Sequence, residues 1–211
     1  MGNFYVNYTL RGPSQQDVAH ALKGRRAAAT PYLKECVVVF DEASDSQDDA
    51  VILQLAASVS KSLSCPCLSV LNHDDDILKY WLHVSGALED EYDSNPGYFD
   101  FDSMKGLDWG AIGSPDDLAA AARKLPSPPP PKGGNALKLC EAFGSNRAAE
   151  VESILQRCQQ TGDKYVFEVE RHHDLIQAIG LPEFAVGTSF ASFAYGEFPA
   201  GLTEEDILFT E

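Results

Sequence analysis

One segment of the chain concentrates polar side chains that could do chemistry. Residues 72–81 are NHDDDILKYW, so a histidine and three consecutive aspartates stand directly before a run of large apolar residues. Carboxylate and imidazole groups could bind Ca²⁺ or Mg²⁺, helped by the acids of residues 89–93 if the next hairpin folds back. Calcium loops, however, space their ligands on alternate residues around a glycine bend, and this run has neither feature. We therefore expect a solvated acidic turn at residues 72–76, with no metal and no cofactor.

A hydrolytic mechanism is the main enzymatic alternative. General acid–base catalysis needs two carboxylates in different environments, so that burial raises the pKa of one while the other stays ionised. Asp74 and Asp93 could form such a pair. Among 32 acidic residues, however, some close pairs arise by chance. A hydrolase or metal-dependent enzyme that uses Asp74–Asp76 and Asp93 remains the alternative to a non-enzymatic protein, and no residue is assigned as catalytic.

A second polar cluster lies at residues 168–174, EVERHHD, where we expect a strand to give way to a helix. His172 and His173 are adjacent, so their side chains point in different directions on a helix. Zinc-binding helices place two histidines four residues apart, which this segment does not. A polar cap at the start of a helix is favoured over a zinc site, and His173 remains a candidate acid or base only for the enzymatic alternative.

The cysteines give little support to nucleophilic or redox chemistry. Cys65 and Cys67 are separated by one residue, whereas the oxidoreductase motif is Cys-x-x-Cys. Cys36, Cys67 and Cys158 lie on apolar faces, as small core residues do. The chain also lacks a Walker loop, a Gly-x-Ser-x-Gly elbow and a His-Glu-x-x-His motif. These observations leave enzymatic activity open but disfavoured.

Charge and composition exclude several classes of partner. The chain has 211 residues, 44% of them hydrophobic, and carries 32 acidic against 16 basic residues for a formal charge of -16. Such a surface repels nucleic-acid phosphate and anionic lipid. No apolar run approaches the length that spans a bilayer. Five cysteines, an odd number, without a signal peptide indicate reduced thiols and a cytoplasmic location.

The elements that must position these residues follow from the hydrophobic periodicity. Strands are expected at residues 3–10, 25–30, 35–41 and 67–71. Helices are expected after Ser14 and, ending near Leu63, after the capping segment Ser46–Asp49. The order β-α-β-β-α-β predicts an α+β fold of the ferredoxin-like, split-βαβ type, and a hairpin at residues 77–92 should extend its sheet. Both helices should pack on one face of the sheet. The residues expected in that core are Val18, Leu22, Ile52, Leu55, Val59, Val37, Val39 and Leu68.

The rest of the chain is expected to form a smaller part. Residues 126–134, PSPPPPKGG, have the composition of a polyproline linker. This divides the chain into a ferredoxin-like domain at residues 1–125, the linker, and a mixed, helix-rich subdomain at residues 135–211. Within the subdomain we expect helices at 136–143, 146–160 and 171–179, a strand at 165–169 and an extended run at 190–195.

The favoured function is protein binding through an acidic and aromatic surface. Residues 72–102 contain nine acids and one base, Lys79, interleaved with aromatic residues. Aromatic side chains anchor interfaces, and complementary charge speeds encounter and selects the partner. The sequence therefore predicts an adaptor or immunity-like module that binds a basic protein surface, whereas the competing interpretation is that the acids only keep the protein dissolved. The predicted binding residues are His73, Asp74, Asp75, Asp76, Trp81, Glu91, Tyr92, Asp93, Tyr98 and Phe99.

Overall fold

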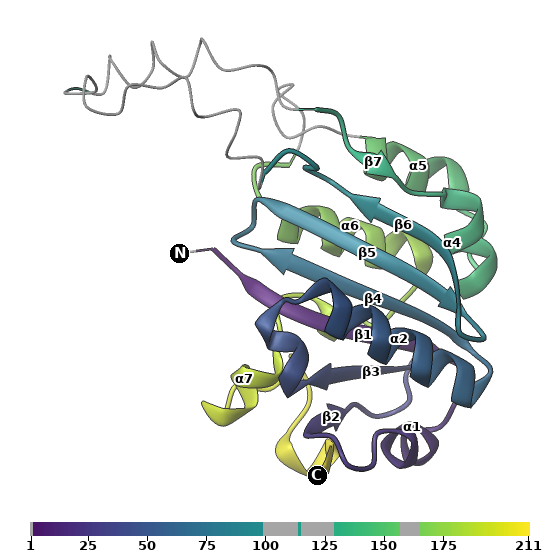
Figure 1. Ribbon diagram of the computed structural model, residues 1–211, viewed down its shortest axis with the longest axis vertical. Coiled ribbons are helices and arrows are strands. Elements are labelled where there is room, and N and C mark those ends of the chain that lie inside the picture. Colours follow the sequence, from purple (N-terminus) through teal and green to yellow (C-terminus); the bar gives the residue numbers. More distant parts are fainter. Residues whose placement is uncertain (1, 99–113, 115–128, 157–164) are drawn as a thin grey trace.

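The computed structural model describes residues 2–98, 114, 129–156 and 165–211. Its centre is an eight-stranded sheet with the strand order β7-β6-β5-β4-β1-β3-β2-β8 (Figure 1). Every pair of neighbouring strands is antiparallel. The strands are β1 (Phe4–Arg11), β2 (Ala27–Ala29), β3 (Cys36–Asp41), β4 (Pro66–His73), β5 (Ile77–Val84), β6 (Ala87–Asp93), β7 (Lys132–Gly133) and β8 (Leu208–Thr210).

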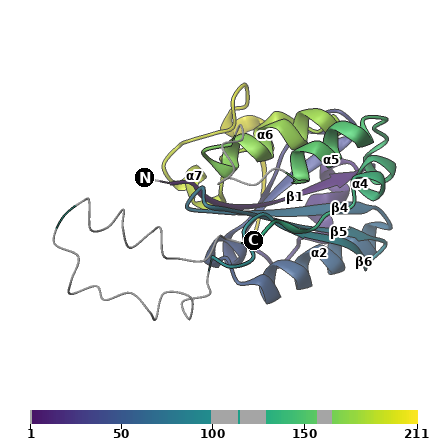
Figure 2. The same cartoon turned by 90° about the horizontal axis from the view of Figure 1, so that it is seen from above.

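Helices cover both faces of this sheet, so the described part of the chain is an α+β structure with three layers (Figure 2). Short 3₁₀ helices at Glu42–Ser46, Glu183–Ala185 and Glu204–Asp206 join the larger elements. None of the helices in the described ranges is long and apolar enough to cross a membrane. The six α-helices of the described residues are α1 (Gln15–Ala21), α2 (Asp49–Leu63), α4 (Ala136–Phe143), α5 (Ala148–Gln156), α6 (Glu168–Ile179) and α7 (Phe190–Ala194).

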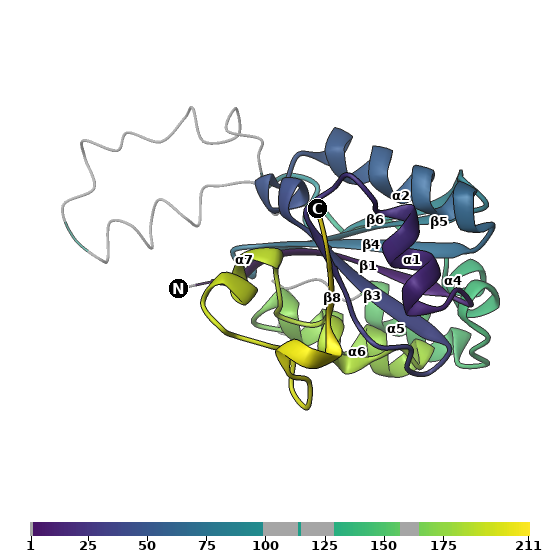
Figure 3. The same cartoon turned by 90° about the horizontal axis from the view of Figure 1, so that it is seen from below.

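Helices α1 and α2 lie together on one face of the sheet (Figure 3). Ser14 and Asp17 form the capping box that starts α1, and the Asp48 side chain caps α2. Strands β1 and β3 are neighbours beneath the two helices. The expected packing on this face is confirmed for seven of the eight predicted core residues, which share one apolar cluster: Val18, Leu22, Val37, Val39, Ile52, Leu55 and Val59.

The prediction for Leu68 was wrong, because this side chain packs on the opposite face of the sheet. Successive residues of a strand point to opposite faces. Cys67 faces α2, so Leu68 must face away from it. Helices α4, α5 and α6 cover that second face, and their apolar residues form one cluster with Leu68, Leu82 and the neighbouring residues of β4 and β5.

Two predictions of extended structure in the later part of the chain were also wrong. Residues 168 and 169, expected in a strand, open α6, because a buried ion pair between Glu168 and Arg171 joins positions three residues apart on a helix. The run at 190–195 contains α7 instead. Asp45 accepts hydrogen bonds from the first backbone N–H groups of this helix, at Phe190 and Ala191, and so stabilises it.

The remaining elements join the same sheet. Residues 132–133 of the expected linker form β7, which pairs with β6. Strand β8 pairs with β2 at the other end of the sheet, a pairing that the sequence did not suggest. Several predictions lie outside the described residues: the position of Phe99, the linker residues 126–128 and the core position of Cys158. The same holds for residues 115–124, where Ser114 and Pro115 predict the start of a helix.

Candidate functional site

The acidic turn, defined as Asp74–Asp76, joins β4 to β5. Its first two residues adopt left-handed backbone conformations, with φ of 54° at Asp74 and 59° at Asp75. The Asp76 N–H donates to the His73 carbonyl at 3.0 Å and closes the turn. Aspartate tolerates this backbone conformation better than most residues, because its short side chain can hydrogen-bond locally. The turn geometry alone therefore explains why several aspartates occur together here.

The three carboxylates of the acidic turn have different surroundings. The Asp75 side chain is buried and accepts hydrogen bonds from the backbone N–H and the side-chain amide of Asn3, at 3.0 and 2.9 Å. Asp76 accepts a hydrogen bond from the Tyr98 hydroxyl at 3.1 Å, whereas Asp74 is exposed. In residues 2–98, 114, 129–156 and 165–211, no three His, Cys, Asp or Glu side chains are grouped so that they could hold a metal ion.

A row of three aromatic rings lies beside the acidic turn. The imidazole of His73 packs edge-on against Phe4 and Tyr98, with ring centroids 5.0 and 6.0 Å apart. Its Nδ1 atom lies 2.6 Å from the Gln47 side-chain oxygen, which fixes the ring next to the start of α2. Phe4 is 51% exposed. We call Phe4, His73 and Tyr98 the ring row.

Phe4 belongs to this surface although sequence analysis did not select it. It is the first residue of β1 and lies opposite His73 in the register between β1 and β4. Because these residues are far apart in the sequence, only the pairing of the two strands brings them together. In the sequence, the feature that could have pointed to Phe4 as a surface residue is a large aromatic side chain at the very start of a predicted strand.

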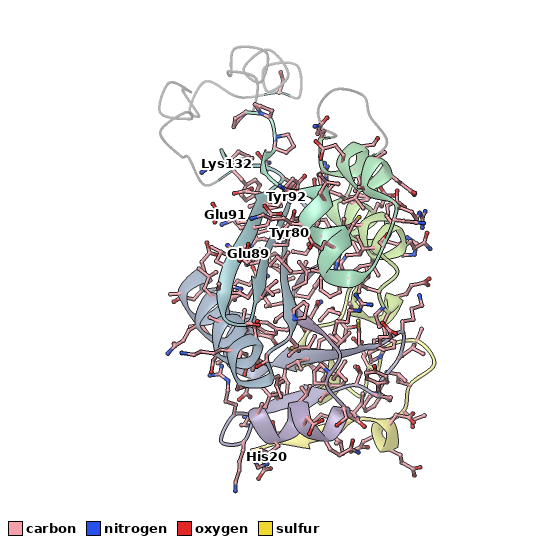
Figure 4. The ribbon with its side chains drawn as sticks, turned by 90° about the vertical axis from the view of Figure 1, so that its right-hand side faces the viewer. His20, Tyr80, Glu89, Glu91, Tyr92 and Lys132 are labelled. Atoms are coloured by element: carbon pink, nitrogen blue, oxygen red, sulfur yellow. The ribbon has the colours of Figure 1, made fainter. Side chains whose placement is uncertain are left out.

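Trp81 and Tyr92 take no part in an exposed aromatic surface. Trp81 is 5% exposed and packs in the cluster beneath α2. Tyr92 lies on the other face, stacks on Tyr80 with centroids 5.3 Å apart, and donates its hydroxyl proton to the Leu155 carbonyl. Figure 4 shows Tyr80 and Tyr92 on the side of the sheet that faces α4, with Glu91 on the opposite side.

Glu91 and Asp93 line a shallow cavity of about 240 Å³ on the α2 side of the sheet, together with Lys79 and Trp81. Lys79 forms an ion pair with Asp49 at 3.0 Å and lies over the Trp81 ring. The Asp93 carboxylate accepts a hydrogen bond from the Asn95 N–H at 2.9 Å. Glu91 is exposed. This cavity therefore adds two acidic groups to the surface but contains no enclosed chamber for a substrate.

The polar cluster at residues 168–174 is divided between core and surface: Glu168, Arg171 and His172 are buried, whereas Glu170 is exposed and His173 is partly exposed. Arg171 and Glu168 are fully buried and form an ion pair at 2.7 Å, and Arg171 also donates to the Ile154 carbonyl of α5 at 2.6 Å. Burial raises the pKa of the Glu168 carboxyl group, although Arg171 opposes this effect. His172 is buried as well, with Nδ1 2.8 Å from the Tyr5 hydroxyl. These contacts connect α5, α6 and β1.

The cysteines of the described residues that show shifted pKa values are poor nucleophiles. Burial raises the pKa of Cys36 to about 12 and that of Cys65 to about 11. The pKa of Cys67 is also well above its ordinary value, again because of burial. A thiolate is the reactive form of cysteine, so these side chains are suited to packing and not to catalysis.

Comparison with known proteins adds no relative from which a role could be transferred. The chain matches no protein-family model, no curated protein and no solved structure. A functional assignment therefore depends on the geometry and charge of the chain itself. The ring row with its neighbouring acids is one surface that combines exposed aromatic area with negative charge.

Proposed function

We propose that this protein is a non-enzymatic interaction module, of an adaptor or immunity-like type, that binds a basic protein surface at the ring row and the acidic turn. The observation that carries this proposal is the ring row itself, because the half-exposed Phe4 packs against His73, the residue directly before the exposed Asp74 of the acidic turn. A lysine or arginine side chain of the partner would be attracted by both the aromatic rings and the carboxylate, since cations bind to aromatic faces and to carboxylates.

The surroundings of the ring row strengthen its negative character. His73 contacts the side chain of Gln47, which lies just before α2. The next two residues, Asp48 at the N-cap and Asp49 at the first position of α2, bring two more carboxylates next to Gln47 in the sequence. Lys79, the nearby base, is already paired with Asp49. Carboxylates from separate segments thus gather at one corner of the sheet, which favours a basic partner by charge and disfavours nucleic acid.

The predicted site residues divide between surface and support in this proposal. Trp81 and Tyr92 are buried, so they would hold β5 and β6 in place and not touch the partner. The exposed contacts would come from Phe4 and Asp74, with Glu91 as a peripheral charge. Interfaces typically place such aromatic anchors at the centre and charges at the rim.

We also propose that residues 3–93 form a ferredoxin-like domain with an added hairpin. The contiguous strand order β4-β1-β3-β2, all antiparallel, supports this assignment, as does the packing of α1 and α2 on one face. A cytoplasmic location is consistent with the four free cysteines of the described residues. Many unrelated functions occur on this type of fold, so the fold itself does not support the binding proposal.

A capture experiment with matched variants tests the proposed function. The immobilised protein is incubated with lysate at low and at high salt, and the bound proteins are identified by mass spectrometry. Asp74→Asn removes one exposed charge while keeping a residue that tolerates the left-handed backbone. Glu141→Gln is the matched control, because Glu141 is an exposed acid of α4 outside the proposed site.

The expected result is a basic partner that is lost at high salt, is weakened by Asp74→Asn and by Phe4→Ser, and is retained by Glu141→Gln. Equal loss with the two acid variants, Asp74→Asn and Glu141→Gln, and no loss with Phe4→Ser would show that only net charge matters. Capture that is unchanged by the Asp74 and Phe4 variants would reject the ring row as the binding surface.

A further inference from the structure

The two end strands of the sheet differ in how their outer edges are protected. Strand β7, at one end of the described sheet, carries Lys132 and follows the proline run 128–131. Proline and lysine are the residues with which proteins prevent an edge strand from pairing with another chain. Strand β8, at the other end, has the sequence Leu-Phe-Thr, and its Phe209 is 46% exposed. The strand itself contains neither proline nor lysine.

The hydrogen bonds of β2 show which way its backbone groups point. The Thr30 N–H donates to the Val38 carbonyl at 2.9 Å, and the Glu42 N–H donates to the Arg26 carbonyl at 3.0 Å. Successive residues of an antiparallel strand direct their backbone N–H and C=O groups alternately toward the strand on one side and toward the strand on the other. The even-numbered residues of β2 therefore bond to β3, and the odd-numbered residues point to β8.

This alternation fixes the direction of the β8 backbone. Ala27 pairs with Thr210 and Ala29 pairs with Leu208, so Leu208 and Thr210 direct their backbone groups toward β2. Phe209, between them, directs its N–H and C=O outward from the sheet edge. An extended chain lying beside β8 would find these two groups ready to pair.

A partly exposed aromatic cluster lies next to this edge. Phe193 of α7 contacts the ring of Phe209 edge-on with centroids 5.6 Å apart, and α7 contains no fully buried residue. Tyr195, just after α7, is 82% exposed. Large exposed apolar clusters on proteins usually mark interaction sites. We call the following four residues the aromatic platform: Phe190, Phe193, Phe198 and Phe209.

The charges around β8 select the kind of chain that can bind there. The exposed acids Glu204, Glu205 and Asp206 lie just before β8, separated from it by Ile207. The sequence from residue 172 to residue 211 contains no lysine or arginine. Arg26, which lies over the Phe190 ring, is paired with Glu42. A second copy of this chain would bring the same acids to the contact, so like charges oppose self-pairing.

We propose that the outer edge of β8 binds an extended, basic segment of another protein, which adds to the sheet as a further strand. The backbone of that segment pairs with the outward groups of Phe209. Its alternate apolar side chains pack on the aromatic platform, and its lysine or arginine residues lie near Glu204–Asp206. This surface is distinct from the ring row, and binding at one does not require binding at the other.

Three blocked peptides of equal length test this inference. The first alternates lysine and valine, the second replaces the central valine by proline, and the third replaces every lysine by glutamate. Proline cannot take part in strand pairing, and glutamate reverses the charge. Binding is followed by hydrogen exchange and by the NMR signal of the Phe209 amide in the full-length protein.

The expected result is that the lysine–valine peptide slows exchange of the Phe209 amide and binds about tenfold more tightly than either control peptide. Phe209→Ser should weaken this binding, with circular dichroism confirming that the variant is folded. Asp74→Asn should not weaken it. Equal binding of the lysine–valine and proline peptides, or an unchanged Phe209 amide, would overturn the inference and indicate nonspecific adsorption to an acidic surface.

Discussion

Protonation of His172 should destabilise the folded protein at mildly acidic pH. Burial, with a smaller contribution from the charge of His173, lowers the pKa of His172 from 6.5 to about 3. The unfolded chain therefore binds a proton at a pH where the folded protein does not. The stability contributed by the neutral imidazole is present above pH 6.5 and decreases as the pH falls from there toward 3. This pKa difference corresponds to a loss of about 2 kcal/mol in unfolding free energy between pH 7 and pH 5.

Urea unfolding at several pH values, on the wild type and on His172→Gln, measures this contribution. Glutamine can still accept a hydrogen bond from the Tyr5 hydroxyl but has no proton to gain in this range. The wild type should lose about 2 kcal/mol more than the variant between pH 7 and pH 5. Glu168, whose pKa is raised, affects both proteins alike. Equal pH dependence in the two proteins, or an NMR titration of His172 near its ordinary pKa, would refute the reasoning.

Three further predictions concern stability and reactivity. Replacing Arg171 by methionine should lower the unfolding free energy by about 3–5 kcal/mol, because it leaves the buried Glu168 without its cation; adding Glu168→Gln should restore part of the loss in urea unfolding. Cys36 and Cys67 should be unreactive toward a thiol reagent at pH 8 until urea unfolds the chain, because burial raises their pKa values; rapid labelling of the folded protein would contradict this. Melting temperatures should not change with Ca²⁺, Mg²⁺, Zn²⁺ or EDTA, because the carboxylates of the acidic turn have separate surroundings; a rise of several degrees with one ion would support the metal-dependent alternative.

Local patterns predicted much of the first half of the chain. The capping box at Ser14 and the strand alternation place α1, α2 and the hairpin of β5 and β6 where the structure has them. These features depend on residues close together in the sequence. Leu68 was assigned to the wrong face because the alternation of a strand places side chains correctly only when its starting phase is right.

Long-range packing accounts for what the sequence did not reveal. Trp81 and Tyr92 are aromatic residues in an acidic segment, yet helices from both ends of the chain bury them on opposite faces of the sheet. The side-chain types at 165–169 suit a strand, but the buried pairing of Glu168 with Arg171 favours a helix. Phe4 joins the ring row only through the pairing of β1 with β4. Each of these outcomes depends on contacts between residues far apart in the sequence.

The most direct test of the proposed function is a hydrogen-exchange footprint of the captured partner on this protein. Backbone amide hydrogen exchange is measured on the complex and on the free protein under the same low-salt conditions. The slowing of exchange on binding is then assigned to individual peptide fragments of the chain. The proposal predicts that protection on binding is greatest in the peptides that contain Phe4 and residues 73–76. Protection confined to other surfaces, with these peptides exchanging as in the free protein, would contradict it.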